Sequence, residues 1–208
     1  VGVQVRLGDK ARARFFQSLY STTSWSYYRE GMRELAAGLR RAGAAGVAFV
    51  VTAGGSMGSN EKDIADAKRH LASVGRVVFS TAESPYIDLA VLRQCDGLVI
   101  GPSTFGWWAA YLAALPAGRV VAPRQLFNPA LPKSHALVKG FREPDYYPPA
   151  WRLLDNARAD ASVATTEEAR PGDQRKRLFL VEKHQARLDE SIFASFARVG
   201  RQCSMASR

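Results

Sequence analysis

The chain has 208 residues, a hydrophobic fraction of 47% and a formal net charge of +10 at neutral pH. This apolar content is ample for the core of one domain plus an appendage. The positive charge is compatible with anionic partners such as nucleotide phosphates, nucleic acid or a lipid surface, and equally with a solvated basic surface. The two cysteines, Cys95 and Cys203, exclude a disulfide framework and a zinc site.

The first predicted elements are a strand and a long helix. Residues 1–6 are strand-like from the first position, so we expect a fragment whose preceding part is missing. A basic and polar segment, residues 11–23, predicts a loop with a short helix. Residues 24–42 predict a helix with arginines on one face. The opposite, apolar face consists of Tyr28, Met32, Leu35 and Leu39.

A second strand is predicted at residues 47–51, followed by the glycine-rich turn 52–58. Such a turn can cradle a dinucleotide, and Glu83 stands about where a ribose-binding acid would be expected. The spacing is Gly-Gly-x-x-Gly rather than Gly-x-Gly-x-x-Gly, however, and it follows the second strand. An ordinary surface turn is therefore favoured. A helix at residues 60–74 and a strand at 76–80 follow.

The chain is organised around residues 84–112. Ser84-Pro85 predicts a helix start, and residues 97–100 predict a short buried strand. Gly101-Pro102 ends that strand, and Ser103-Thr104 can cap a helix that begins at Phe105. A strand that ends in small polar residues at a helix N-terminus forms an anion site, because the free amides and the helix dipole point the same way.

A membrane span is the competing interpretation of the uncharged run 97–118. Pro102, Ser103 and Thr104 interrupt that run, so a strand followed by a helix explains it better. We expect no membrane contact by this chain itself.

The C-terminal part changes character after a last predicted strand at residues 119–122. The chain is then rich in proline and loops up to Trp151, and residues 155–174 are predicted to be disordered. Residues 178–181 predict a short strand, and 182–201 predict a helix that is either a partner helix or an unpacked tail. We therefore expect an α/β domain at 1–151, with a doubly wound, mostly parallel sheet, and a tail at 152–208.

Several strings resemble the α1,2-fucosyltransferases, the galactoside 2-α-L-fucosyltransferase family. The resemblance extends from Val1 to about Trp151. Its most specific strings are Asp88-Leu89-Ala90, Cys95-Asp96, Ser103-Thr104-Phe105-Gly106-Trp107-Trp108-Ala109-Ala110-Tyr111-Leu112 and Tyr146-Tyr147-Pro148-Pro149-Ala150-Trp151. The resemblance implies the Rossmann-like, donor-binding half of a two-domain GT-B glycosyltransferase.

The family's first motif, His-x-Arg-Arg-x-Asp, falls on Gln4, Arg6 and Asp9, with departures at Gln4 and Leu7. By resemblance, Arg6 and Ser103 hold the β-phosphate of the donor, and Asp88 and Gln4 face guanine. Asp9, Thr104 and Phe105 complete the implied binding set. The residues alone also allow an Arg6–Asp9 structural ion pair, and a helix-dipole role for Asp88.

The resemblance implies an inverting enzyme that transfers L-fucose from GDP-fucose to the 2-hydroxyl of a galactose-terminated glycan. We expect no cofactor, no metal ion and no nucleic-acid partner, and the sequence assigns no catalytic base. For a eukaryotic full-length protein, the family implies the lumenal side of the Golgi membrane. The acidic residues that the family places after the second strand are absent until Glu61.

Two alternatives stay open at this point. One is a degenerate, non-catalytic domain that still binds a GDP-sugar, which the departures at Gln4 and Leu7 favour. The other is a dinucleotide-binding oxidoreductase domain, which the glycine-rich turn favours.

Overall fold

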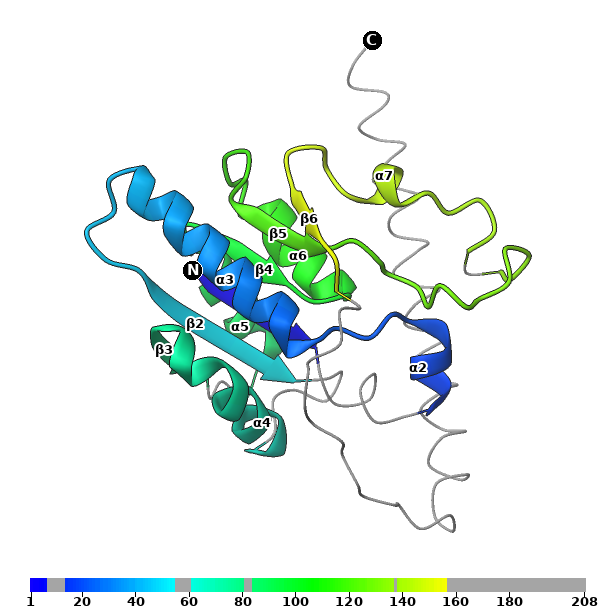
Figure 1. Ribbon diagram of the computed structural model, residues 1–208, viewed down its shortest axis with the longest axis horizontal. Helices are drawn as coiled ribbons and strands as arrows, with labels where there is room; N and C mark the ends of the chain where they lie inside the picture. The colour runs from blue at the N-terminus through cyan, green and yellow to red at the C-terminus, as the bar shows by residue number, and fades with distance from the viewer. Residues whose placement is uncertain (7–13, 55–60, 81–83, 137, 157–208) are drawn as a thin grey trace. The chain divides into compact units, whose positions relative to one another are not determined.

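The computed structural model describes residues 1–6, 14–54, 61–80, 84–136 and 138–156. In this part of the chain, parallel strands form one open sheet in the order β3-β2-β1-β4-β5-β6 (Figure 1). The strands are β1 (Gly2–Arg6), β2 (Ala48–Gly54), β3 (Arg76–Phe79), β4 (Leu98–Ile100), β5 (Val120–Pro123) and β6 (Arg152–Leu154). The predicted doubly wound α/β class is confirmed, and this strand order is that of Rossmann folds.

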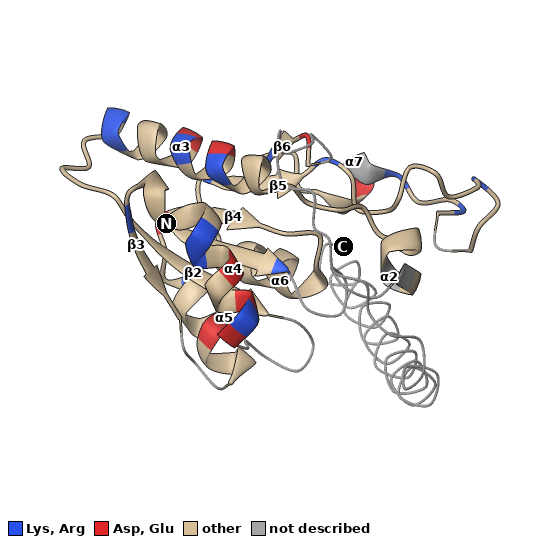
Figure 2. Ribbon diagram, turned by 60° about the horizontal axis from the view of Figure 1, so that its bottom comes forward, with Lys and Arg blue, Asp and Glu red and all other residues tan. Residues whose placement is uncertain are grey.

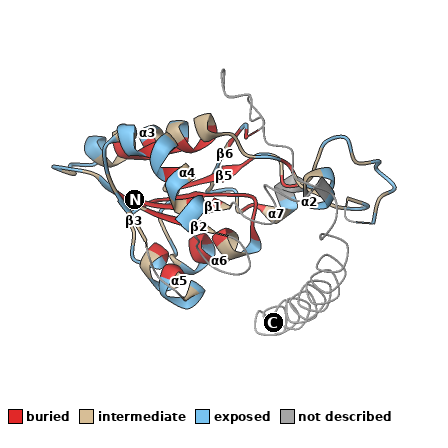
Figure 3. Cartoon of the chain, turned by 90° about the horizontal axis from the view of Figure 1, so that it is seen from below, coloured by how far each residue is buried: buried red, intermediate tan, exposed pale blue. Residues whose placement is uncertain are grey.

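Four helices of the described residues cover the two faces of the sheet. They are α3 (Trp25–Arg41), α4 (Glu61–Leu71) with the 3₁₀ turn η1 (Ala72–Val74), α5 (Pro85–Arg93) and α6 (Thr104–Leu112). Two short helices, α2 (Arg14–Leu19) and α7 (Glu143–Tyr146), lie beside the sheet. Helices α3 and α4 share one apolar cluster with β1 and β2, and α5 and α6 share another with β4 and β5. Figure 3 shows α3 on one side of the strands and α5 and α6 on the other, with buried residues facing inward.

Strand β1 lies in the middle of the sheet because both of its faces can be buried. Val1, Val3 and Val5 pack into the cluster beneath α3 and α4. On the other face, Gly2 makes room for Leu98, since an added Cβ atom would lie 2.6 Å from the Leu98 Cδ2 atom. The central strand therefore tolerates close packing from both layers.

Two strands differ from the sequence-based expectation. Strand β2 continues three residues beyond Val51, because Thr52, Ala53 and Gly54 pair in register with β1. Strand β6 is not predicted at all, since three residues are too few to show a periodicity. It is fixed by parallel pairing with β5. Residues 55–60, which contain the rest of the glycine-rich turn, lie outside the described residues.

Aromatic side chains attach the proline-rich segment before β6 to α6. The Trp107 Nε1 atom donates a hydrogen bond to the Tyr146 carbonyl at 2.9 Å. The Trp107 ring also packs against Trp151, and Tyr147 is buried in the cluster beneath α6. These aromatic side chains therefore hold the proline-rich segment against α6.

The predicted strand 178–181 and helix 182–201 lie outside the described residues. The domain boundary after Trp151 stays a prediction, although β6 continues the sheet beyond that residue. Among the helices of the described ranges, none combines the length and the apolar character that a membrane crossing requires.

Candidate functional site at the carboxyl edge of the sheet

The sheet has a topological switch point between β1 and β4. The chain leaves β1 toward β2 on one side, whereas β4 and β5 continue on the other side. The two strands are paired in register, with Gln4 opposite Ile100. In open α/β sheets, ligands bind in the crevice outside the carboxyl ends of the strands at such a point. Arg6 ends β1 here, and residues 101–103 follow β4 here.

The N-terminus of α6 faces this crevice. Ser103 is the N-cap residue in extended conformation, and its buried hydroxyl accepts a hydrogen bond from the Gly106 amide at 3.4 Å. Thr104 is exposed, and Phe105 packs against the apolar cluster beneath the helix. The amides of the first helical turn have no intrahelical partner, and the helix dipole adds positive potential. The arrangement is suited to an anion.

The Gln4 side chain holds the loop between β4 and α6 in place. It is 4% exposed, and its Oε1 atom accepts a hydrogen bond from the Gly101 amide at 3.2 Å. A Cβ atom at Gly106 would lie 2.6 Å from the same oxygen, so only glycine lets α6 approach β1 this closely. The contact positions the loop between β4 and α6. The predicted contact of Gln4 with guanine stays a prediction.

Arg6 lies between this loop and α3. A Cβ atom at Gly101 would lie 3.2 Å from the Arg6 Cβ atom and 2.7 Å from the Tyr28 hydroxyl, so the strand ends are in close contact. The Arg6 amide donates to the Tyr28 Oη atom at 3.4 Å. Burial raises the pKa of Tyr28, and the hydrogen bonds to the Arg6 amide and the Thr23 side chain, together with the Arg6 charge, oppose this only in part. Tyr28 therefore stays neutral.

The neighbouring Tyr27 fixes the end of β4. Its Oη atom donates to the Ile100 carbonyl at 2.7 Å, directly before the loop that leads to α6. Burial also raises the pKa of Tyr27. The sequence predicts Tyr28 on the apolar face of α3, and the structure buries both tyrosines, each with an exposure of 1%. Their hydroxyl groups also position the site, and the apolar periodicity of α3 could not show this.

Asp88 lies at the same edge of the sheet but farther along it. It is in the first turn of α5, 7% exposed, and it accepts a hydrogen bond from the Ser80 hydroxyl at 2.6 Å, just after β3. Burial raises the pKa of the Asp88 carboxyl group, and the Ser80 hydrogen bond lowers it in part. Asp63 is a second buried carboxylate, in the first turn of α4, that the sequence did not single out.

Asn156 is a buried polar residue at the end of β6 that sequence reasoning missed. Its Nδ2 atom is within 3.1 Å of three acceptors, the Ser21 hydroxyl and the Thr22 and Gln125 carbonyls. Its Oδ1 atom accepts from the Gln125 amide at 2.9 Å. It therefore ties the segment before α3 to the segment after β5. Its role depends on contacts up to 135 residues apart, which leave no local pattern.

The structure thus brings Gln4, Arg6, Ser103, Thr104 and Phe105 together, with Asp88 at the same edge of the sheet. Asp9 lies outside the described residues. Among the residues that the structure does describe, no group of three or more His, Cys, Asp or Glu side chains is placed to hold a metal ion.

The fold defines a doubly wound α/β domain, with Arg6 and the N-terminus of α6 at its switch point. Glycosyl transferase family 11 matches residues 1–142, and the chain belongs to this family. Galactoside alpha-(1,2)-fucosyltransferase 1 of Leontocebus fuscicollis and that of Ateles belzebuth are similar to it, each 34% identical over 154 residues. The match covers 73% of this chain and 37% of each relative. No solved structure gives a significant match.

Proposed function

We propose that this chain is the donor-binding half of a galactoside 2-α-L-fucosyltransferase that uses GDP-fucose. The observation that carries the proposal is the position of Arg6 beside the N-terminus of α6 in a member of glycosyl transferase family 11. The names of the relatives supply the fucose and the galactoside. The chain spans only 37% of their length, so the acceptor site is assigned to the other part of a longer protein.

The proposed chemistry is an inverting displacement without a metal ion. The 2-hydroxyl oxygen of galactose attacks the anomeric carbon of fucose as the bond from that carbon to the β-phosphate oxygen breaks. GDP leaves, and the hydroxyl proton passes to a general base, a role to which no residue of this chain is assigned. Negative charge then develops on the diphosphate. Arg6, Ser103 and the first-turn amides of α6 stabilise this charge, because a fixed cation and oriented N–H groups need no rearrangement during the reaction. Asp88 accepts hydrogen bonds from guanine.

The direct test is calorimetric titration of the chain with GDP, UDP, ATP and NAD. We expect GDP to bind most tightly, with an affinity that EDTA leaves unchanged and that falls as salt screens the phosphate contacts. Preference for NAD would favour the dinucleotide-binding oxidoreductase instead. Loss of GDP binding on chelation would contradict the metal-free assignment.

A second candidate function is GDP-sugar binding without turnover. Gln4 stands where the family motif has a histidine, and its carbonyl is engaged by the Gly101 amide. The two functions differ in one measurement, the release of GDP from GDP-fucose in the presence of lactose as a terminal galactoside.

We expect the chain alone to bind GDP without transferring fucose. Holding donor and acceptor in attack geometry is worth up to about 7–11 kcal/mol, and a cleft between two domains provides it in a GT-B enzyme. Transfer by a chain extended to the length of its relatives would support the enzyme, and absence of transfer by that chain would support the binding domain. Robust turnover by the 208-residue chain alone would contradict the proposal that this chain is only the donor-binding half of the enzyme.

A further inference from the structure

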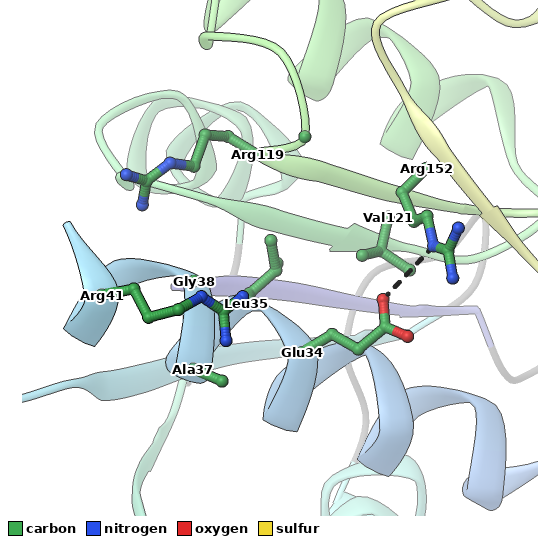
Figure 4. A pocket seen from close by; sticks show the side chains of 9 residues that line it. Glu34, Leu35, Ala37, Gly38, Arg41, Arg119, Val121 and Arg152 are labelled. Atoms are coloured by element: carbon green, nitrogen blue, oxygen red, sulfur yellow. Dashed lines mark ion pairs between the residues drawn. The ribbon is translucent and has the colours of Figure 1, made fainter.

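A basic pocket lies at the opposite, amino-terminal edge of the sheet. It has a volume of about 410 Å³ and lies between the C-terminal half of α3 and the starts of β5 and β6 (Figure 4). Its lining combines apolar side chains with three arginines and one carboxylate. These residues are Glu34, Leu35, Ala37, Gly38, Arg41, Gly118, Arg119, Val121 and Arg152. The carboxyl edge, where β1 and β4 end, takes no part in it.

The charges in this pocket are unbalanced. Arg152 forms an ion pair with Glu34 at 3.5 Å, and both side chains are substantially exposed. The pocket contains no second carboxylate for Arg41 and Arg119. Figure 2 shows that the basic positions on α3 are interspersed with acidic ones, so this imbalance is local to the pocket rather than common to the helix. Two guanidinium groups in one concave site repel each other, and a bound anion would remove that repulsion.

Arg119 carries the strongest argument for a ligand. Its Nη1 atom is buried and has no hydrogen-bond partner among the described residues. A buried donor of a charged group is costly when it is left unsatisfied. Arg119 is not needed to cap α3, because the amides of residues 42–44 already bond to the Gly38, Leu39 and Arg40 carbonyls.

Gly38 lines the pocket beside Arg41. It lies inside α3, where glycine costs about 1 kcal/mol relative to alanine. An added Cβ atom there would meet only the Arg41 Nη2 atom, at 3.9 Å. The Arg41 side chain therefore lies back along the helix over Gly38 rather than extending away from it. The glycine leaves space in front of a guanidinium group.

We propose that this pocket binds an oxyanion ligand, a phosphate or sulfate group, independently of the site at the carboxyl edge. Arginine suits this ligand because its planar fork donates two parallel hydrogen bonds to oxyanion oxygens. The volume exceeds that of a single ion, so the pocket has room for a group attached to the oxyanion. A free anion and a phosphate monoester share the chemistry that these arginines recognise.

The test is calorimetric titration of the full 208-residue chain with inorganic phosphate, sulfate and glucose 6-phosphate, at ionic strength held constant with chloride. We expect these oxyanions to bind saturably. We also expect GDP, added at a saturating concentration, not to displace them. Arg119→Gln and Arg41→Gln should each weaken it by about tenfold or more, since each removes a direct charge-assisted contact. Arg93→Gln, which removes an exposed arginine at the end of α5, should leave it unchanged.

Thermal unfolding provides a second measurement that does not depend on heats of binding. Phosphate should raise the unfolding temperature of the wild type and of Arg93→Gln, but not of Arg41→Gln, whose exposed side chain can be replaced without disturbing the fold.

Tighter binding of glucose 6-phosphate than of phosphate would identify a monoester as the ligand, and equal binding would identify the free anion. Absence of saturable binding, displacement by GDP, or an equal effect of Arg93→Gln would each overturn the proposal.

Discussion

Arg6 and Asp88 lie at the same edge of the sheet, but their surroundings differ. Arg6 ends the central strand, beside a loop held by Gln4 and next to the Tyr28 hydroxyl. Asp88 is buried at the start of α5 against the Ser80 hydroxyl. The family resemblance assigns both residues to one ligand, although they belong to two different motifs. Their separate surroundings mean that each can be tested by itself.

Arg6→Ala should weaken GDP binding far more than Arg124→Ala. Removing a partly buried cation that faces phosphate costs about 2–5 kcal/mol, whereas a peripheral charge contributes well under about 1 kcal/mol. Arg124 is a matched control because it is exposed and lies at the carboxyl end of β5. Calorimetric titration with GDP measures both. Equal losses would mean that Arg6 has only a structural role.

Asp88→Asn should relax the preference for guanine. A carboxylate accepts two hydrogen bonds from guanine, whereas an amide presents a donor in place of one acceptor, a mismatch of about 1–3 kcal/mol. The ratio of GDP to ADP affinity, from parallel titrations, should therefore fall toward one. An unchanged affinity ratio would mean that Asp88 only complements the dipole of α5 and does not contact the base.

The same variant has a pH dependence of known sign. Because burial raises the pKa of Asp88, the folded state disfavours the ionised carboxylate, and this penalty is present at neutral pH. The uncharged amide of Asp88→Asn would avoid the penalty and could still accept the hydrogen bond from Ser80. We therefore expect the variant to be at least as stable as the wild type at pH 7. Urea unfolding at a series of pH values measures this difference. The stability advantage of the variant should shrink as the pH falls toward about 4, where the Asp88 carboxyl group protonates in both the folded and the unfolded state.

At the scale of elements, Gly106 determines how closely α6 packs against β1. Gly106 lies in the first turn of the helix, and the close approach to Gln4 and Ile100 that it allows brings the Ser103 cap next to β1. Helix propensity by itself would favour alanine at this position. The packing against the central strand outweighs that preference.

Gly106→Ala and Gly38→Ala should therefore change stability in opposite directions. The new methyl group at Gly106 would overlap the Gln4 side chain, which should cost about 1–3 kcal/mol. At Gly38 the same methyl group meets only one atom at van der Waals distance, and the helix should gain about 0.5–1 kcal/mol. Urea unfolding followed by circular dichroism measures both. Destabilisation by Gly38→Ala would show that the space beside Arg41 is smaller than the structure indicates.

At the scale of the whole molecule, Asn156 connects segments that are distant in sequence. Its side chain bonds to the segment before α3 and to the segment after β5, and its carbonyl accepts from the Ser24 amide at the start of α3. The part of the chain just beyond β6 thus helps to hold the edge of the sheet at which the candidate site lies.

Asn156→Ala should lower the free energy of unfolding by about 3 kcal/mol or more. The substitution leaves several buried donors and acceptors unsatisfied, at about 1–3 kcal/mol each. Asn128→Ala is the control, because that side chain makes two hydrogen bonds at a less buried position. Asn156→Asp should also be destabilising, since a carboxylate cannot donate to the Thr22 and Gln125 carbonyls. Chemical denaturation of the three variants measures this, and equal losses for positions 156 and 128 would contradict the role given to Asn156.

The sequence by itself determined the alternation of strands and helices, the cap of α6 at Ser103 and the family, because these depend on local periodicity and on contiguous motifs. It also placed Arg6 at the end of one strand and Ser103 after another, but it could not show that those strands are neighbours. The tertiary structure decided the strand order, the engagement of Gln4 with Gly101, the addition of β6 and the basic pocket between α3 and β5. Each of these depends on contacts between residues far apart in the chain, whose free energy is realised only when the layers pack together.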